Sequence, residues 1–382
     1  MLPTGRSYGE LFMAQWNKYT IMHKDRKVAC IHKSGKCVIY NHALMPYNLY
    51  LEESTADDTD ERINNLENFY YWCSARMLTL DRKYAKEILN ALNKKQAVTD
   101  RDRAEIAISY HCLSLTDVYW VKNFRENVSF DDINLFDNSL AGAFVDVCLH
   151  GKAMTVQNSK LLTQEDVAGD LMTAGVAPKA WTRRNGTFFL MKDGEERDVE
   201  AELLADRIID CFKVDHVKYT EEYYDGKKVS VSKIISSLDV SLVPAEYVEI
   251  YAANHGMKLL DIVYEKSFYD YHMMNIIDYL IGNNDRHWSN WGFYADNKNN
   301  KLLGLYPLMD FNKAFSDYKG INGGICQTAG ERTSQKDAAL EGVKAVGLNQ
   351  IKEVKREWFA DSERYDTFCQ RLKCLKEYAH NA

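Results

Sequence analysis

The first forty residues alternate apolar and polar positions over short runs. Three such runs, 20–23, 27–32 and 36–40, are separated by the polar triplet 24–26 and by a turn at Ser34-Gly35. Alternation with a period of two, bounded by glycine and polar residues, is typical of strands joined by tight turns. The chain is therefore predicted to begin with a small antiparallel sheet.

From about residue 60 to residue 115 the apolar positions recur every three or four residues. Leu66, Phe69 and Cys73 show this spacing, which predicts helices. A mostly polar break at 93–102 separates two of them. The polar segment 152–160 is rich in turn-forming residues, so we place the main domain boundary there.

Between residues 161 and 240 the pattern changes to two hairpins and one helix. Asn185-Gly186 and Asp225-Gly226 are the two-residue turns that favour β-hairpins most strongly. Each lies between runs of strand-forming residues, 179–181 with 187–192 and 216–224 with 227–235. The segment 199–212 is apolar at helical spacing and separates the two hairpins.

Beyond Pro244 the chain is mainly helical, apart from a polar loop at 282–290 and a short hairpin, 291–294 with 302–308. The pattern predicts an α+β fold in three regions. These are an α/β region of strands then helices (1–150), a sheet-rich lobe (151–240) and a larger helical lobe (241–382). A ligand normally binds in the cleft between two such lobes.

Composition and charge narrow the class of protein. The formal charge is -7 over 382 residues, which argues against a chain whose main role is to coat nucleic acid. The nine cysteines are odd in number and contain no C-x-x-C pair, which favours reduced thiols. No secretory signal or membrane-length apolar run is present. We expect a cytoplasmic protein that binds neither membrane nor nucleic acid directly.

Three oxygen-bearing side chains stand out in the segment 282–310. Asp285 and Asn290 lie five positions apart on the polar loop, and the following hairpin brings the chain back to Asp310. Mg²⁺ prefers oxygen ligands and needs only one or two carboxylates when phosphate supplies the rest. Phosphoryl transfer needs a further carboxylate to position the attacking hydroxyl. Asp285 suits that second task, and Asn290 and Asp310 suit the metal.

The motifs D-R-H-W-S-N-W-G-F and P-L-M-D-F-N in this segment resemble the catalytic and metal-binding motifs of HipA-type serine/threonine kinases. These kinases belong to the phosphatidylinositol 3/4-kinase-like superfamily. The resemblance implies a bilobal kinase fold, ATP and Mg²⁺ as cofactors, Asp285 and His287 as catalytic residues, and Asn290 and Asp310 as metal ligands. His287 serves equally well as a residue that holds the loop by a hydrogen bond.

A kinase also needs a lysine on the sheet lobe and a glutamate on the next helix. Lys192 ends a predicted strand, and Glu202 lies in the predicted helix that follows. Glu200 is the alternative partner, but the sequence A-E-L-L-A-D-R-I resembles the helix of the family better with Glu202.

The resemblance extends to two further parts of the nucleotide site. Gly175, followed four residues later by Lys179, resembles the phosphate-side loop of the family, although Met172 stands where many members carry an autophosphorylated serine. The segment that holds Ser232 and Ile234 corresponds to the hinge strand whose backbone pairs with adenine.

The sequence thus predicts an ATP- and Mg²⁺-dependent bacterial kinase that phosphorylates serine or threonine of a protein. The resemblance also implies a toxin–antitoxin system with an antitoxin-type protein partner. Two alternatives stay open. A phosphoinositide kinase uses the same loop, but the segment 311–335 has only one more basic than acidic residue. A catalytically inactive module that binds nucleotide or a partner is the other.

Overall fold

The computed structural model describes residues 18–53, 58–77, 99–108, 110–138, 179–193, 195–316, 318, 320–329 and 332–381. The chain forms two compact units. The first comprises residues 1–188, 236–241 and 296–301, and the second comprises 189–235, 242–295 and 302–382. The division into three domains near residues 150 and 240 stays a prediction.

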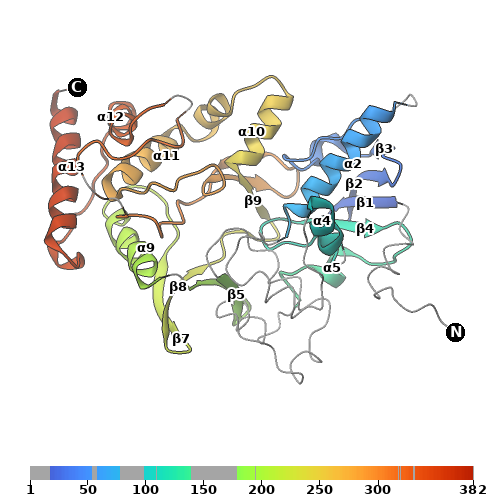
Figure 1. The fold of residues 1–382 in the computed structure, drawn as a ribbon, viewed down its shortest axis with the longest axis horizontal. Coiled ribbons are helices and arrows are strands. Elements are labelled where there is room, and N and C mark those ends of the chain that lie inside the picture. Colours follow the sequence, from blue (N-terminus) through green and yellow to red (C-terminus); the bar gives the residue numbers. More distant parts are fainter. Residues whose placement is uncertain are drawn as a thin grey trace. The chain divides into compact units, whose positions relative to one another are not determined.

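The first unit contains a four-stranded antiparallel sheet in the order β3-β2-β1-β4 (Figure 1). Its strands are β1 (Lys18–His23), β2 (Arg26–His32), β3 (Cys37–Ile39) and β4 (Tyr119–Asn123). The three strands predicted near the N-terminus are confirmed, whereas β4 is a strand that the pattern did not single out. Its side chains are almost all buried, so alternation does not mark it.

Helices pack with this sheet in the first unit. The aromatic side chains of Phe69 and Trp72 on α2 are buried, and Phe69 stacks on Tyr19 of β1. The elements of this unit besides the sheet are η1 (His42–Leu44), α2 (Thr59–Ser74), α4 (Asp100–Ile108), α5 (Phe130–Ile133) and β5 (Lys179–Arg184). The predicted polar break at 93–102 is too long, because α4 already begins at Asp100.

Both predicted two-residue turns are present. Asn185 and Gly186 have φ values of 49° and 77°, and Asp225 and Gly226 have 51° and 77°. Positive φ at both central positions is the signature of a type I′ turn, which matches the twist of the flanking strands. The first turn joins β5 to β6 (Thr187–Lys192), and the second joins β7 (Tyr219–Tyr224) to β8 (Lys227–Lys233).

In the second unit, β6, β8 and β7 are neighbours in that order in an antiparallel sheet. Helix α9 (Glu196–Ile209) packs on β7 and β8 (Figure 1) and buries its apolar face. A second small sheet has the order β11-β10-β9, formed by β11 (Leu302–Leu305), β10 (Gly292–Asp296) and β9 (Val240–Pro244). Strand β9 was not predicted.

Four helices form the remainder of this unit: α10 (Ala245–Asn254), α11 (Leu259–Ile281), α12 (Gln335–Val346) and α13 (Ser362–Asn381), with a short η2 (Arg356–Trp358). Helices α12 and α13 pack against α11, whose C-terminal half is buried all round (Figure 1). Antiparallel sheets combined with these helices confirm the α+β class.

Helix α11 ends where the polar loop begins. The residue that caps its C-terminus is Gly282, with φ 61° and ψ 42°. Glycine adopts this left-handed conformation without steric cost. A Cβ at this position would lie 2.4 Å from the ring of Tyr318, so backbone and space both require glycine. The chain thereby leaves the helix in one defined direction.

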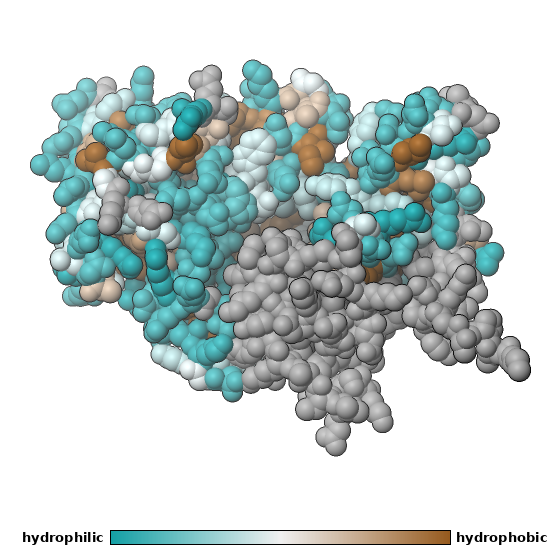
Figure 2. Space-filling model, viewed as in Figure 1, coloured by the Kyte–Doolittle hydropathy of each residue, from teal (hydrophilic) through white to brown (hydrophobic). Residues whose placement is uncertain are grey.

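The visible surface of the described residues is mostly polar, with apolar side chains in small separate groups (Figure 2). Within the described ranges, no helix combines the length and the apolar content that crossing a bilayer requires.

Candidate active site

The predicted catalytic loop is anchored by one buried arginine. Arg286 donates through Nε and Nη2 to both carboxylate oxygens of Asp278 on α11, at 2.8 and 3.0 Å. Its Nη1 donates to the carbonyl of Asn290 at 2.8 Å and to that of Met309 at 2.5 Å. A single guanidinium therefore joins α11, the loop and the residue before Asp310. The sequence predicted that the loop and Asp310 converge. Arg286 joins the loop to Met309, the residue before Asp310, through its hydrogen bonds.

Asp285 lies on this loop with its side chain 42% exposed. Burial raises the pKa of its carboxyl above the usual range; the neighbouring His287 lowers it, and the negative charge of Asp310 raises it. His287 Nε2 lies 3.8 Å from Asp285 Oδ1, and His287 Nδ1 accepts a hydrogen bond from the amide of Ser289 at 3.3 Å. His287 therefore both holds the loop and acts on the charge of Asp285.

Asp310 has φ 62°, in the left-handed region. That conformation costs a residue other than glycine about 1–2 kcal/mol. Asp310 Oδ1 lies 3.0 Å from Lys192 Nζ, and the Asp310 amide donates to the Tyr219 hydroxyl at 3.0 Å. Both contacts stabilise the residue in this strained conformation.

Lys192, the last residue of β6, contacts two carboxylates. Its Nζ is 2.6 Å from Glu202 Oε1 on α9 as well as 3.0 Å from Asp310. Glu200 instead lies 3.7 Å from Lys228, so Glu202 is the glutamate that meets Lys192. Burial lowers the pKa of Lys192, but the carboxylates of Asp310 and Glu202 outweigh it, and the pKa is well above its usual value.

Glu202 is itself held by a serine. The Ser230 hydroxyl on β8 donates to Glu202 Oε2, and Ser230 stands opposite Lys192 in the β6–β8 register. Glu202 and Ser230 are each 1% exposed. In this dry environment a charged hydrogen bond contributes more than at the surface, so Glu202 is fixed to face Lys192.

The predicted cation ligands have suitable chemistry. Asn290 donates through Nδ2 to the carbonyl of Asp285 at 2.8 Å, which turns the donor side of its amide toward the loop and leaves the oxygen as its ligand atom. Asp310 supplies a carboxylate that is 25% exposed. One carboxylate and one amide oxygen fit Mg²⁺ when phosphate oxygens complete its shell.

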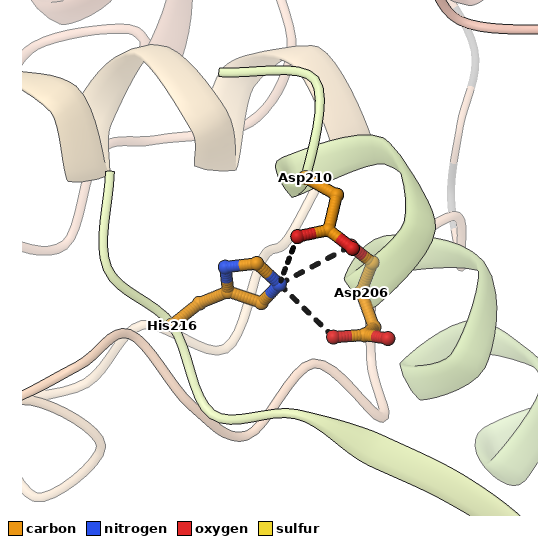
Figure 3. Close-up of side chains that lie close together, drawn as sticks. All are labelled: Asp206, Asp210 and His216. Atoms are coloured by element: carbon orange, nitrogen blue, oxygen red, sulfur yellow. Dashed lines mark hydrogen bonds and ion pairs between the residues drawn. The ribbon is translucent and has the colours of Figure 1, made fainter. Parts of the chain in front are cut away.

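A separate charged cluster lies between α9 and β7 (Figure 3). His216 Nε2 is 2.9 Å from Asp206 Oδ1 and 3.9 Å from Asp210 Oδ1. The spacing resembles that of a metal site. However, Lys218 Nζ contacts Asp210 and lies 3.1 Å from His216 Nε2, so an ammonium already provides the positive charge. The cluster ties the end of α9 to the segment that leads into β7.

The other predicted nucleotide-binding residues lie in or beside strands β5 and β8 or outside the described residues. Gly175 lies outside the described residues, and Lys179 begins β5 in the first unit. Ser232 is buried in β8, opposite Leu190 on one side and Tyr219 on the other. Its backbone belongs to the sheet, and Ile234 lies just beyond the end of that strand.

Three residues of this site were not assigned a role from the sequence: Arg286, Tyr219 and Ser230. Arg286 stands inside the D-R-H motif. Its burial against Asp278 of the preceding helix can be recognised only once the fold is known. Tyr219 and Ser230 sit in ordinary strand sequence, which carries no such signal.

No protein-family model and no curated protein matches the sequence. A chain from the structure of the Shewanella oneidensis MR-1 toxin–antitoxin system HipA, HipB and its operator DNA is similar, with a TM-score of 0.53 and 11% identity over 95% of this chain and 97% of that one. The Helicobacter pylori proinflammatory kinase CtkA matches with a TM-score of 0.44 and 14% identity over 54% of this chain and 90% of that one.

At such identities the similarity concerns the fold, and function has to be argued from the site. The HipA structure also contains operator DNA, so this comparison lends no support to the prediction that the chain binds no nucleic acid directly. The chain has a HipA-like fold, as its D-R-H-x-x-N segment predicts.

Proposed function

We propose that this chain is an ATP- and Mg²⁺-dependent protein kinase that transfers the γ-phosphoryl group to a serine or threonine hydroxyl. The observation that carries the proposal is the contact of Lys192 with both Glu202 and Asp310, at 2.6 and 3.0 Å. A lysine held by a helix glutamate beside a metal aspartate is the arrangement that kinases use for the phosphates of ATP.

In this proposal the sheet β6-β8-β7 with α9 forms the nucleotide lobe, and α10 to α13 form the helical lobe of a bilobal kinase. Lys192 binds phosphate oxygens, and Glu202 orients it. Asn290 and Asp310 hold Mg²⁺, which neutralises charge that develops on the transferred phosphoryl group. The assignment of Gly175, Lys179, Ser232 and Ile234 to nucleotide binding stays a prediction from the sequence.

Asp285 positions the acceptor. Its carboxylate accepts the proton of the hydroxyl while the hydroxyl oxygen bonds to the γ-phosphorus. The bond from the γ-phosphorus to the bridging oxygen breaks, and ADP leaves with that electron pair. The raised pKa of Asp285 makes it a better proton acceptor than an ordinary aspartate.

A protein substrate and an antitoxin-type partner complete the proposal. The similar HipA structure includes HipB, which supports a search for such a partner. The proposal includes a cytoplasmic site of action and a bacterial origin.

The test is phosphoryl transfer from labelled ATP to a bacterial lysate. We expect Asp285→Asn to lower the rate constant at least about 100-fold, because a positioned base contributes that much or more, and Asp310→Asn to abolish metal-dependent transfer. The control is Asp261→Asn on α11, an exposed aspartate. Undiminished transfer by both site variants would refute the assignment.

The same assay separates the alternatives. Phosphate that appears in phosphoinositide vesicles and not in protein identifies a lipid kinase. Binding of ATP in calorimetry, together with no transfer to any acceptor, identifies an inactive binding module.

A further inference from the structure

Tyr219, the first residue of β7, contacts both the lysine and the metal aspartate of the proposed kinase site. It is only 6% exposed. Its hydroxyl accepts the hydrogen bond from the Asp310 amide at 3.0 Å. The centre of its ring is 5.5 Å from Lys192 Nζ and 6.3 Å from that of Phe311, whose ring meets it edge-on at 76°.

The position of Tyr219 is fixed by the segment just before it. Val217 donates its amide to the carbonyl of Leu308 at 2.8 Å, and Leu308 donates to the carbonyl of Asp215 at 3.0 Å. These two backbone hydrogen bonds join the segment to the chain two residues before Asp310. On the other side, His216 bonds to Asp206 near the end of α9 (Figure 3).

The hydroxyl acts on the backbone of Asp310, and through it on the carboxylate. Asp310 is left-handed at φ 62°, a conformation that is uncommon for residues other than glycine and that contacts with the surroundings stabilise. The hydrogen bond from its amide fixes the direction of the peptide and therefore of the Cα–Cβ bond. A metal ligand held in one direction loses less entropy when it binds.

We propose that Tyr219 is a positioning residue for the metal aspartate: its hydroxyl holds Asp310 in the conformation that binds Mg²⁺. The inference rests on the proposed function, because it takes Asp310 as a metal ligand. It assigns Tyr219 no contact with the nucleotide.

Tyr219→Phe removes only the hydroxyl and keeps the ring beside Lys192 and Phe311. We expect a rise of about three- to tenfold in the Mg²⁺ concentration that gives half of the metal-dependent gain in nucleotide affinity. This factor corresponds to the loss of one ordinary hydrogen bond. Affinity for the nucleotide without metal should stay within about twofold, because the Lys192–Glu202 pair is untouched. Tyr223→Phe, an exposed position on the same strand, is the matched control.

The readout is calorimetric binding of a non-hydrolysable ATP analogue over a series of MgCl2 concentrations, with thermal melting to check that each variant is folded. A Tyr219→Phe protein with the wild-type Mg²⁺ dependence overturns the inference. An equal loss of affinity with and without Mg²⁺ also overturns it, because that indicates a general structural role.

A 3-fluorotyrosine at position 219 keeps shape and hydroxyl but weakens the acceptor. It should shift the Mg²⁺ dependence in the same direction by a smaller factor, and no shift would contradict the inference even if Tyr219→Phe were unstable. A wild-type protein that binds the analogue with Mg²⁺ but transfers no phosphate refutes the kinase proposal alone. In that case the comparison of Tyr219→Phe with the wild type still tests the positioning role. Failure of the wild type to bind any nucleotide overturns both.

Discussion

Two aspartates from one stretch of chain are distinguished by their neighbours. Asp310 faces the ammonium of Lys192 at 3.0 Å. Asp285 is 42% exposed and lies 3.8 Å from His287 Nε2; burial and Asp310 raise its pKa, and His287 lowers it. Carboxylates in different surroundings are suited to separate roles. In the proposed function Asp310 is the metal ligand and Asp285 is the base.

This difference predicts the pH dependence of transfer. In the proposed mechanism Asp285 acts in its ionised form, so we expect activity to fall as the pH drops through its pKa. His287→Gln removes a positive charge that lowers this pKa, and we therefore expect the acidic limb of kcat/KM to move to higher pH. A pH–rate profile measures the shift.

The control for this profile is His255→Gln, an exposed histidine at the end of α10, which should leave the limb unchanged. A limb that moves to lower pH in His287→Gln would contradict the sign of this effect.

The residue types of the site were largely predictable, and their mutual contacts were not. The order strand–lysine, helix–glutamate, loop–aspartate is readable along the chain. The choice between Glu200 and Glu202 depends on how α9 packs on the sheet. In the structure Glu200 lies near Lys228 instead of Lys192. The role of Tyr219 depends on a contact 91 positions away in sequence, for which a strand tyrosine gives no local signal.

At the scale of elements, the catalytic loop is held by a buried ion pair. Arg286 and Asp278 side chains are 2% and 6% exposed, and Asn283 also donates to Asp278 at 3.0 Å. A buried pair contributes little net stability, but removal of one partner leaves the other charge unpaired in a dry site. The pair therefore fixes the loop rather than strengthening the fold.

Arg286→Met should lower the free energy of unfolding by about 3–5 kcal/mol and abolish transfer. Urea denaturation measures the first effect. The control is Glu377→Gln, which breaks an exposed pair with Lys373 on α13 and should change stability by less than about 0.5 kcal/mol. A loss in Arg286→Met no larger than in this control would show that the anchor is dispensable.

Elements with strong local signals were predicted well. Asn-Gly and Asp-Gly turns fix two hairpins because few residues adopt positive φ at both positions. β4 and β9 were missed, since the first is buried on both faces and the second ends at Pro244. Short strands of this kind are defined by their partners in the sheet, and those partners lie far away in sequence.

At the scale of the molecule, Lys192, Asp285, Asn290 and Asp310 all belong to the second compact unit, whereas Lys179 belongs to the first. A ligand that binds only the folded form stabilises it, by about 2.7 kcal/mol at 100 times its Kd. The effect of nucleotide on thermal melting therefore reports directly on this site.

We expect a non-hydrolysable ATP analogue with Mg²⁺ to raise the melting temperature, and excess chelator to reverse most of the rise. Differential scanning calorimetry with and without EDTA checks this. In Asp310→Asn the metal-dependent part of the rise should disappear, because the carboxylate that holds the cation is lost. An equal rise in that variant would place the metal elsewhere.

The contact of Lys192 with two acids has a consequence for how substrate arrives. Nearby charges cancel in pairs, Arg286 with Asp278 and Lys313 with Asp198. Among the described residues, the carboxylates of Glu202 and Asp310 both contact the ammonium of Lys192, and Asp285 lies near Asp310, so these four groups together carry an excess of negative charge. A bare triphosphate would be repelled by this excess. In the proposed kinase, the site therefore favours the nucleotide with its counter-ion already attached over the bare triphosphate.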